Sequence, residues 1–200
     1  MLHALALNCT LKSSPAESSC DLLAQQVLDA LASHEVTGEI VRVVDFDVKP
    51  GVETDMGGGD EWPSIREKVL AADILVFTTP TWMGNMSSVA QRVLERLDAE
   101  LSETDAAGRP ILADKVAVAV VLGNEDGAHS ITAAVFQGLG DVGFTIPSQG
   151  GVYWNGEAMH KTDYKDLPET PEKVASTTKT LAANAAHLAT LLTERPYPAP

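Results

Sequence analysis

The stretch that decides the fold is residues 72–88, ADILVFTTPTWMGNMSS. A short apolar run at residues 74–77 stops at Pro80, and a loop containing Trp82, Gly84 and Asn85 follows. Short apolar runs bounded by breaking residues predict buried strands, and the two serines at the end favour the start of a helix. The stretch therefore predicts a strand that brings an aromatic ring, a glycine and an amide to the carboxyl edge of a sheet, where α/β proteins bind ligands.

The same alternation of strand and helix continues along the whole chain. It predicts an α/β protein: a three-layer αβα sandwich of the flavodoxin-like type, with a five-stranded parallel sheet in the order 2-1-3-4-5. We expect one domain over residues 1–200, a mobile loop or lid at 45–59, and a frayed tail at 195–200. The expected strands are residues 3–8, 39–44, 74–77, 115–122 and 142–147, and the expected helices are 18–32, one beginning at 60–63, 88–101, 128–139 and 168–193.

Composition excludes several classes of protein. The formal net charge is −14 over 200 residues, which argues against nucleic acid as a partner. Two cysteines and five scattered histidines have no metal-site spacing, so we expect no metal. The amino-terminal residues lack the pattern of a signal peptide, and no apolar run has the length of a membrane span. We therefore expect a cytoplasmic protein without membrane insertion.

The loop after the first strand, residues 9–17, is rich in hydroxyl groups and leads into a helix. Hydroxyls, backbone N–H groups and a helix N-terminus bind phosphate, here with little cationic charge. The loop has neither a Walker motif nor the GxGxxG dinucleotide fingerprint. An ordinary serine-rich loop with Ser18 as its helix cap is an equal alternative.

The loops after the third and fourth strands converge with it in the predicted strand order. Trp82 and Met83 offer apolar surfaces, either for a ligand or for another subunit. Residues 123–127 offer backbone donors, although Glu125 could merely cap the next helix and His129 could face water. A phosphate site beside a flat apolar platform suggests a mononucleotide with a large planar ring, and such a cofactor would carry the chemistry.

Three motifs resemble those of the flavodoxin-like NAD(P)H-dependent FMN reductase and quinone reductase superfamily, over nearly the whole chain. Residues 8–20 resemble its phosphate loop and residues 80–88 closely match its isoalloxazine loop, while residues 123–129 and 150–154 are similar to a subgroup. The resemblance implies FMN as the cofactor. The implied cofactor-binding residues are Thr10, Lys12, Ser18, Ser19, Cys20, Pro80, Thr81, Trp82, Met83, Gly84, Asn85, Gly123, Asn124 and Gly127.

Two residues depart from the family pattern. Asn8 replaces a glycine, and Cys20 replaces a threonine whose hydroxyl commonly contacts phosphate. Because Cys20 keeps its backbone N–H, we expect weakened rather than abolished phosphate binding. Tyr153 and Trp154 could equally line the mouth of the site or fill the core beneath the loop.

The resemblance implies an enzyme in which flavin takes a hydride from NADH or NADPH and passes electrons to a quinone, a free flavin or another small acceptor. It implies no catalytic side chain, because hydride transfer to flavin needs no protein base. It also implies a homodimer or homotetramer. The alternative is a flavodoxin-type electron carrier that serves a protein partner. No cluster of basic residues indicates a preference for NADPH over NADH.

Overall fold

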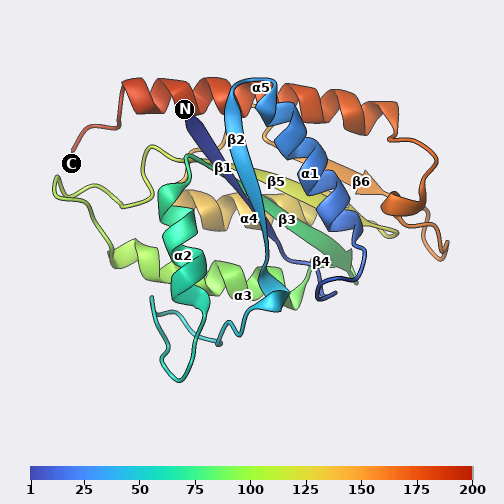
Figure 1. Ribbon diagram of the computed structural model, residues 1–200, viewed down its shortest axis with the longest axis horizontal. Helices are drawn as coiled ribbons and strands as arrows, with labels where there is room; N and C mark the ends of the chain where they lie inside the picture. The colour runs from blue at the N-terminus through green and yellow to red at the C-terminus, as the bar shows by residue number, and fades with distance from the viewer. Residues whose placement is uncertain (200) are drawn as a thin grey trace.

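A single parallel sheet organises the computed structural model, which describes residues 1–199 (Figure 1). Its strands run in the order β2-β1-β3-β5-β6, which confirms the predicted arrangement of an αβα sandwich. Leu7 of β1 lies opposite Phe77 of β3, and Phe77 lies opposite Ala119 of β5. The strands are β1 (Leu2–Asn8), β2 (Val36–Arg42), β3 (Ile74–Trp82), β5 (Val116–Gly123) and β6 (Gly151–Asn155), with β4 (Asn85–Met86) antiparallel to β3.

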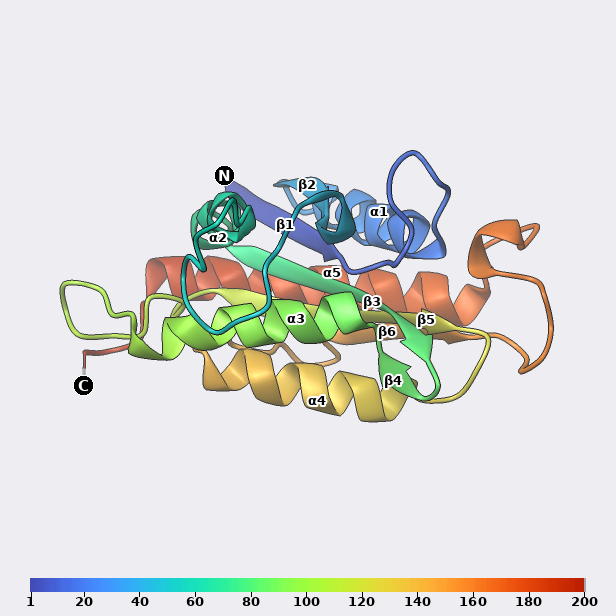
Figure 2. The same cartoon turned by 90° about the horizontal axis from the view of Figure 1, so that it is seen from below.

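Helices cover both faces of the sheet (Figure 2). The face formed by α1 (Ser19–Ala32) and α5 (Glu172–Glu194) lies opposite the face formed by α2 (Trp62–Ala71), α3 (Ser88–Leu97) and α4 (Ala128–Asp141). Three short 3-10 helices complete the structure: η1 (Val43–Asp45), η2 (Asp98–Ser102) and η3 (Tyr164–Asp166).

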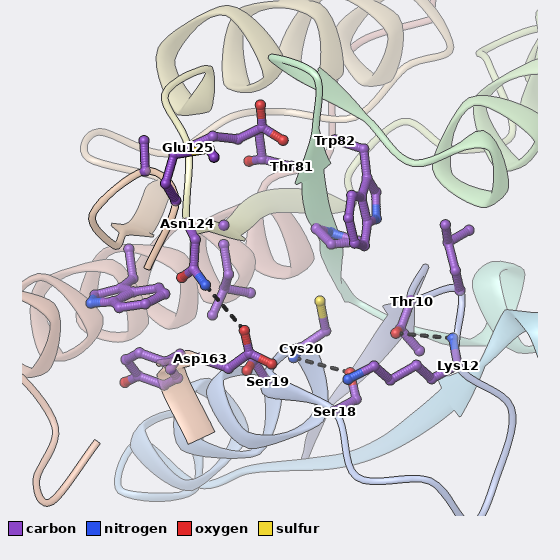
Figure 3. Close-up of a pocket in the computed structure, with 18 residues that line it drawn as sticks. Thr10, Lys12, Ser18, Ser19, Cys20, Thr81, Trp82, Asn124, Glu125 and Asp163 are labelled. Atoms are coloured by element: carbon purple, nitrogen blue, oxygen red, sulfur yellow. Dashed lines mark hydrogen bonds between the residues drawn. The ribbon is translucent and has the colours of Figure 1, made fainter. Parts of the chain in front are cut away.

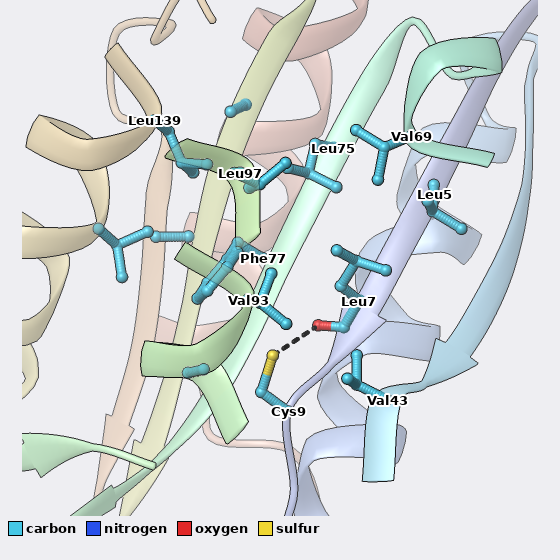
Figure 4. Packing of buried hydrophobic residues seen from close by; sticks show 14 of the residues in the cluster. Leu5, Leu7, Cys9, Val43, Val69, Leu75, Phe77, Val93, Leu97 and Leu139 are labelled. Carbon is cyan, nitrogen blue, oxygen red and sulfur yellow. Dashed lines mark hydrogen bonds between the residues drawn. The ribbon is translucent and has the colours of Figure 1, made fainter. Parts of the chain in front are cut away.

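The core consists of two apolar layers, one on each side of the sheet. Successive side chains of a strand point to opposite faces, so Leu5 and Leu7 pack toward α2 and α3 while Ala4 and Ala6 pack toward α1 and α5. Phe77 lies in the middle of the apolar layer on the side of α2, α3 and α4 (Figure 4). Burial on both faces explains why the central strands are continuous apolar runs.

Three predicted strands differ from the structure. The strand predicted at 74–77 continues through Pro80 to Trp82 as β3, because residues 78–80 still pair with β5. The strand predicted at 39–44 is β2 at Val36–Arg42, because Val43–Asp45 turns into η1. The strand predicted at 142–147 is wrong, since that segment makes only an isolated bridge between Thr145 and Val116. Gly143 has a φ of +116°, which no strand adopts, and the fifth strand of the main sheet forms at β6 instead.

The loop between η1 and α2 is anchored to α3 by a buried ion pair. The side chains of Arg96 and Asp60 are fully buried and lie 2.7 Å apart. Arg96 also donates to the carbonyl oxygens of Lys49 and Glu53 at 2.9 and 2.7 Å. These contacts hold the loop against α3, and all the residues that line the cavity described below come from other segments of the described chain. The lid expected here is therefore not supported.

The tail expected to fray at 195–200 includes Pro200, which lies outside the described residues, and Tyr197 makes hydrogen bonds to the body of the protein. The Tyr197 N–H donates to Asp114 at 2.7 Å, and Arg109 donates to the Tyr197 carbonyl at 3.0 Å. The Tyr197 hydroxyl also lies 3.0 Å from the hydroxyl of Thr145. Three hydrogen bonds thus attach the tail beside the segment before β5.

Candidate functional site

A cavity of about 430 Å³ opens at the carboxyl edge of the sheet, where the loops after β1, β3 and β5 meet (Figure 3). β6 and the segment that follows it form the remaining wall. The lining residues are Thr10, Leu11, Lys12, Ser18, Ser19, Cys20, Pro80, Thr81, Trp82, Leu122, Gly123, Asn124, Glu125, Trp154, Ala158, Met159, Asp163 and Tyr164.

One end of the cavity is the start of α1. Ser18 is the N-cap residue, as predicted, and its hydroxyl accepts a hydrogen bond from the Cys20 N–H at 3.2 Å. That N–H, which we expected to remain for a phosphate, is therefore already engaged. The Lys12 ammonium lies close enough to Cys20 to influence its pKa, so one cation stands beside the helix N-terminus. Hydroxyls, the helix dipole and Lys12 together suit an anionic group.

The loop after β1 takes its shape from polar side chains that lie beneath it. Asn8 is fully buried; its amide donates to Asp21, and its side-chain oxygen accepts from the Thr10 N–H at 2.9 Å. Asp21 also pairs with Arg42, which donates to the Ala16 carbonyl at 2.8 Å. The asparagine that replaces the family glycine therefore organises the loop from within. The sequence pattern did not indicate the role of Arg42, which stands on another strand.

Neither cysteine is a thiolate nucleophile at neutral pH. Burial raises the pKa of the Cys20 thiol to about 12, despite the lowering effects of Ser18, Lys12 and Arg42. Burial also raises the pKa of Cys9, and proximity to Cys20 adds to that effect. Cys20 contributes a small apolar surface to the cavity wall, as Figure 3 shows.

The loop after β3 is a tight hairpin turn into β4. Trp82 pairs with Asn85, and the two residues between them, Met83 and Gly84, have φ values of +51° and +74°. Positive φ at both central positions is the pattern of a type I′ turn. The turn leaves Trp82 54% exposed and Met83 88% exposed.

Ser87 connects this loop to the loop after β1. Its hydroxyl donates to the Cys9 carbonyl at 2.6 Å and accepts from the Ala90 N–H at 3.0 Å, which caps α3. Its own N–H donates to the Thr79 hydroxyl at 3.1 Å. A buried serine thus fixes the spacing between the loop after β1, at the α1 end of the cavity, and the loop that carries Trp82.

The loop after β5 packs directly on the turn after β3. Glu125 accepts a hydrogen bond from the Met83 N–H at 2.7 Å. A Cβ atom on Gly127 would lie 2.7 Å from the Gly84 carbonyl oxygen, so only glycine permits this approach. Glu125 does not cap α4, whose N-cap residue is Gly127.

β6 and the segment after it form a wall of the cavity that the sequence pattern predicted only at Trp154. Trp154 lines the cavity and lies 5.5 Å from the Tyr164 ring, whereas Tyr153 lies outside it with its hydroxyl 3.1 Å from His129. Asn124 donates to Asp163 at 3.2 Å, across the cavity edge (Figure 3). Trp154 was expected either at the mouth or in the core, and it lies at the cavity wall.

The structure brings most of the predicted site residues to this one cavity. Those at its wall are Thr10, Lys12, Ser18, Ser19, Cys20, Pro80, Thr81, Trp82, Gly123 and Asn124. Met83, Gly84, Asn85 and Gly127 instead form the outer side of the two packed loops. Trp154, for which a place at the mouth was one of two alternatives, also lines the cavity. The lining residues not predicted are Leu11, Leu122, Glu125, Ala158, Met159, Asp163 and Tyr164.

The donor set fits FMN. An anion-binding end with Lys12 and the α1 N-terminus lies in the same cavity as the apolar surfaces of Trp82 and Trp154. A phosphate and a planar ring need those two environments joined by a channel. Within residues 1–199, no three or more His, Cys, Asp or Glu side chains gather as a metal site.

The fold and the cavity define a flavodoxin-like flavoprotein. Comparison with protein families places the chain in a specific group: it belongs to the NADPH-dependent FMN reductase family, whose model matches residues 3–158. Membership makes it an enzyme of an oxidoreductase family that is described by its use of FMN and a nicotinamide cofactor.

Three relatives are similar over much of the chain. The 8-demethyl-8-aminoriboflavin-5'-phosphate synthase of Streptomyces davaonensis is 34% identical over 209 residues, covering 98% of this chain and 80% of that protein. The crystal structure of RosB with the bound intermediate 8-demethyl-8-formylriboflavin-5'-phosphate is 32% identical with a TM-score of 0.89, covering 98% of this chain and 82% of that chain.

The third relative is the divalent metal cation transporter MntH of Mycobacterium bovis, which is 38% identical over 169 residues. The match covers 82% of this chain but 25% of the transporter, so the chain spans about a quarter of that relative's length. Among residues 1–199, no helix has the length and apolar character needed to cross a membrane.

Proposed function

We propose that this protein is an FMN-dependent oxidoreductase that takes a hydride from NADH or NADPH and passes electrons to a small acceptor such as a quinone or a free flavin. The observation that carries this proposal is the single cavity in which the α1 N-terminus and Lys12 face the same space as Trp82. The anion-binding end and the aromatic wall match the two ends of FMN.

The chain's own residues would bind and orient the cofactor. Lys12, Ser18 and Ser19 would hold the phosphate, and Trp82 would border the ring with Gly123 on its other edge. Bound FMN would supply the hydride and electron transfer at its ring. The open mouth beside the exposed Trp82 would admit the nicotinamide and the acceptor in turn.

A titration of the purified protein with FMN tests this proposal. We expect saturable changes in the flavin absorption spectrum, followed by bleaching when NADH or NADPH is added without oxygen. Bleaching by the nicotinamide also separates a reductase from a flavodoxin-type carrier, which would need a protein donor. A protein that leaves the FMN spectrum unchanged at all concentrations would contradict the proposal.

A second candidate is an enzyme for which a flavin mononucleotide is the substrate. Nearly the whole chain is similar to an 8-demethyl-8-aminoriboflavin-5'-phosphate synthase and to RosB. Trp154 of β6, together with Asp163 and Tyr164 from the segment after it, also adds a wall beyond the loops that the reductase motifs predict. This wall would place protein side chains at the edge of a bound flavin ring, where a reaction on the flavin itself would take place.

Mass spectrometry of the flavin after turnover discriminates the two candidates. An unchanged flavin mass, together with consumption of nicotinamide, supports the reductase, and a new flavin mass supports the flavin-modifying enzyme. The homodimer or homotetramer, the cytoplasmic location and the choice of nicotinamide remain predictions. Sedimentation, cell fractionation and paired NADH and NADPH assays test them.

A further inference from the structure

The turn at Met83 has a backbone conformation that is rare for a residue other than glycine and that contacts from outside the turn must stabilise. Met83 has a φ of +51°, a left-handed conformation that residues with a Cβ atom adopt only at an energetic cost. Such positions persist where surrounding contacts over-determine them, and they are common at ligand sites. Met83 is 88% exposed, so its side chain contributes little packing to hold the turn.

The outside support comes from one carboxylate, 42 positions further along the chain. Glu125 Oε1 accepts the Met83 N–H at 2.7 Å, which is a charge-assisted hydrogen bond of short length. The same loop approaches the turn again at Gly127, where an added Cβ atom would lie 2.8 Å from the Gly84 Cα. Glu125 and Trp82 both border the cavity (Figure 3).

We propose that Glu125 is a positioning residue that fastens the Met83 turn to the loop after β5 and thereby orients Trp82 for the flavin ring. The inference rests on the proposed binding of FMN. Because the Met83 N–H is bonded to Glu125, this N–H serves the protein and not the cofactor. Two loops from separate strands then act as one platform.

Two substitutions separate the hydrogen bond from the charge. Glu125→Ala removes the acceptor, while Glu125→Gln keeps an oxygen at the same distance along the side chain. Asp126→Asn is the matched control, because within residues 1–199 that neighbouring carboxylate accepts only the N–H of the adjacent Gly127, at 2.7 Å. All three variants are compared with the parent protein by their unfolding midpoints, which report whether each folds.

The primary measurement is hydrogen exchange of the Met83 amide, monitored by NMR without FMN. We expect exchange to be about fivefold faster in Glu125→Ala and near the parent rate in Glu125→Gln and Asp126→Asn. The second measurement is the FMN dissociation constant, which should rise about fivefold in Glu125→Ala alone. Recovery of both values in Glu125→Gln identifies the hydrogen bond as the cause.

Unchanged Met83 exchange in Glu125→Ala, or an FMN dissociation constant equal to that of the parent, would overturn this role for Glu125. Equally fast exchange and equally weakened FMN binding in Asp126→Asn would overturn it too, because the effect would then come from the negative charge of the loop and not from the hydrogen bond of Glu125. Absence of FMN binding by the parent protein is a separate result: it defeats the proposed function, while the exchange rates still report whether Glu125 holds the turn.

Discussion

At the scale of single residues, the Met83–Gly84 turn makes a direct prediction about stability. Asn tolerates the left-handed conformation better than Met, and Asn-Gly is the preferred pair in a type I′ turn. We therefore expect Met83→Asn, whose backbone keeps the φ of +51°, to increase the free energy of unfolding by about 0.5 kcal/mol. Urea unfolding measures the change, and a lower midpoint would show that the Met83 side chain itself stabilises the turn.

Residue-scale interactions also mark the limit of what the sequence could predict. Ser18 follows a local capping pattern, and its role as the N-cap of α1 is confirmed. Arg42 and Glu125 act on loops that lie 26 and 42 positions away, through hydrogen bonds to Ala16 and Met83. No local pattern contains such a contact, because the folded sheet creates the proximity.

At the scale of elements, the buried pair of Arg96 and Asp60 joins the loop before α2 to α3. Replacing Arg96 with Met would leave the Asp60 carboxylate buried without its cation. We expect a loss of about 3 kcal/mol in the free energy of unfolding at pH 7. Arg96 also lies over the Trp62 ring at 5.6 Å, so a change in Trp62 fluorescence should accompany the loss. Lys68→Met, at an exposed ion pair on α2, is the control and should cost little.

The same pair predicts a dependence on pH. Burial alone would raise the pKa of Asp60, but N–H donors, chiefly those of Met56 and Lys49, and the Arg96 guanidinium lower it to about 2. Because the folded pKa lies below the ordinary value of about 3.9, the stabilisation is complete above about pH 5 and is lost as the pH falls through about 2. Urea midpoints of the parent and Asp60→Asn should differ above about pH 5 and converge in acid. A constant difference from pH 6 to pH 2 would contradict this.

The segment after β6 makes a third element-scale prediction. Asn124 donates to the His160 carbonyl and to Asp163, both at 3.2 Å, and so holds residues 156–163 against the end of β5. Asn124→Ala should make amide exchange in that segment about tenfold faster. Asn155→Ala, at an exposed position in β6, is the matched control. Equal exchange in both variants would show that Asn124 does not hold the segment.

Element boundaries show why the fold was predictable while the last strand was not. The first half of β3, at residues 74–77, and nearly all of β5 are continuous apolar runs that are buried on both faces, and their identity and order follow from the pattern. β6 is an edge strand whose Gly151, Tyr153 and Asn155 are not buried, so its signal is weak. The residues at 142–147 have a stronger apolar signal, but Gly143 bends the chain away from the sheet.

At the scale of the whole molecule, ligand binding should be visible as global stability. A ligand that binds only the folded state stabilises it by about 2.7 kcal/mol at a hundred times its dissociation constant. For a chain of 200 residues this corresponds to a rise in Tm of about 5–10 °C. We expect that rise with FMN and a smaller one with riboflavin at the same concentration, because riboflavin lacks the phosphate that Lys12 and the α1 N-terminus would hold.

Lys12→Met should remove much of the difference between the rise in Tm with FMN and the rise with riboflavin. The substitution deletes the cation at the phosphate end but leaves the Trp82 wall intact. Lys161→Met, which changes the net charge equally at an exposed position outside the cavity, should preserve the difference. Thermal unfolding with each flavin measures both. If FMN and riboflavin raised the Tm of the parent equally, the α1 end of the cavity would not be a phosphate site, and the ring platform alone would account for binding.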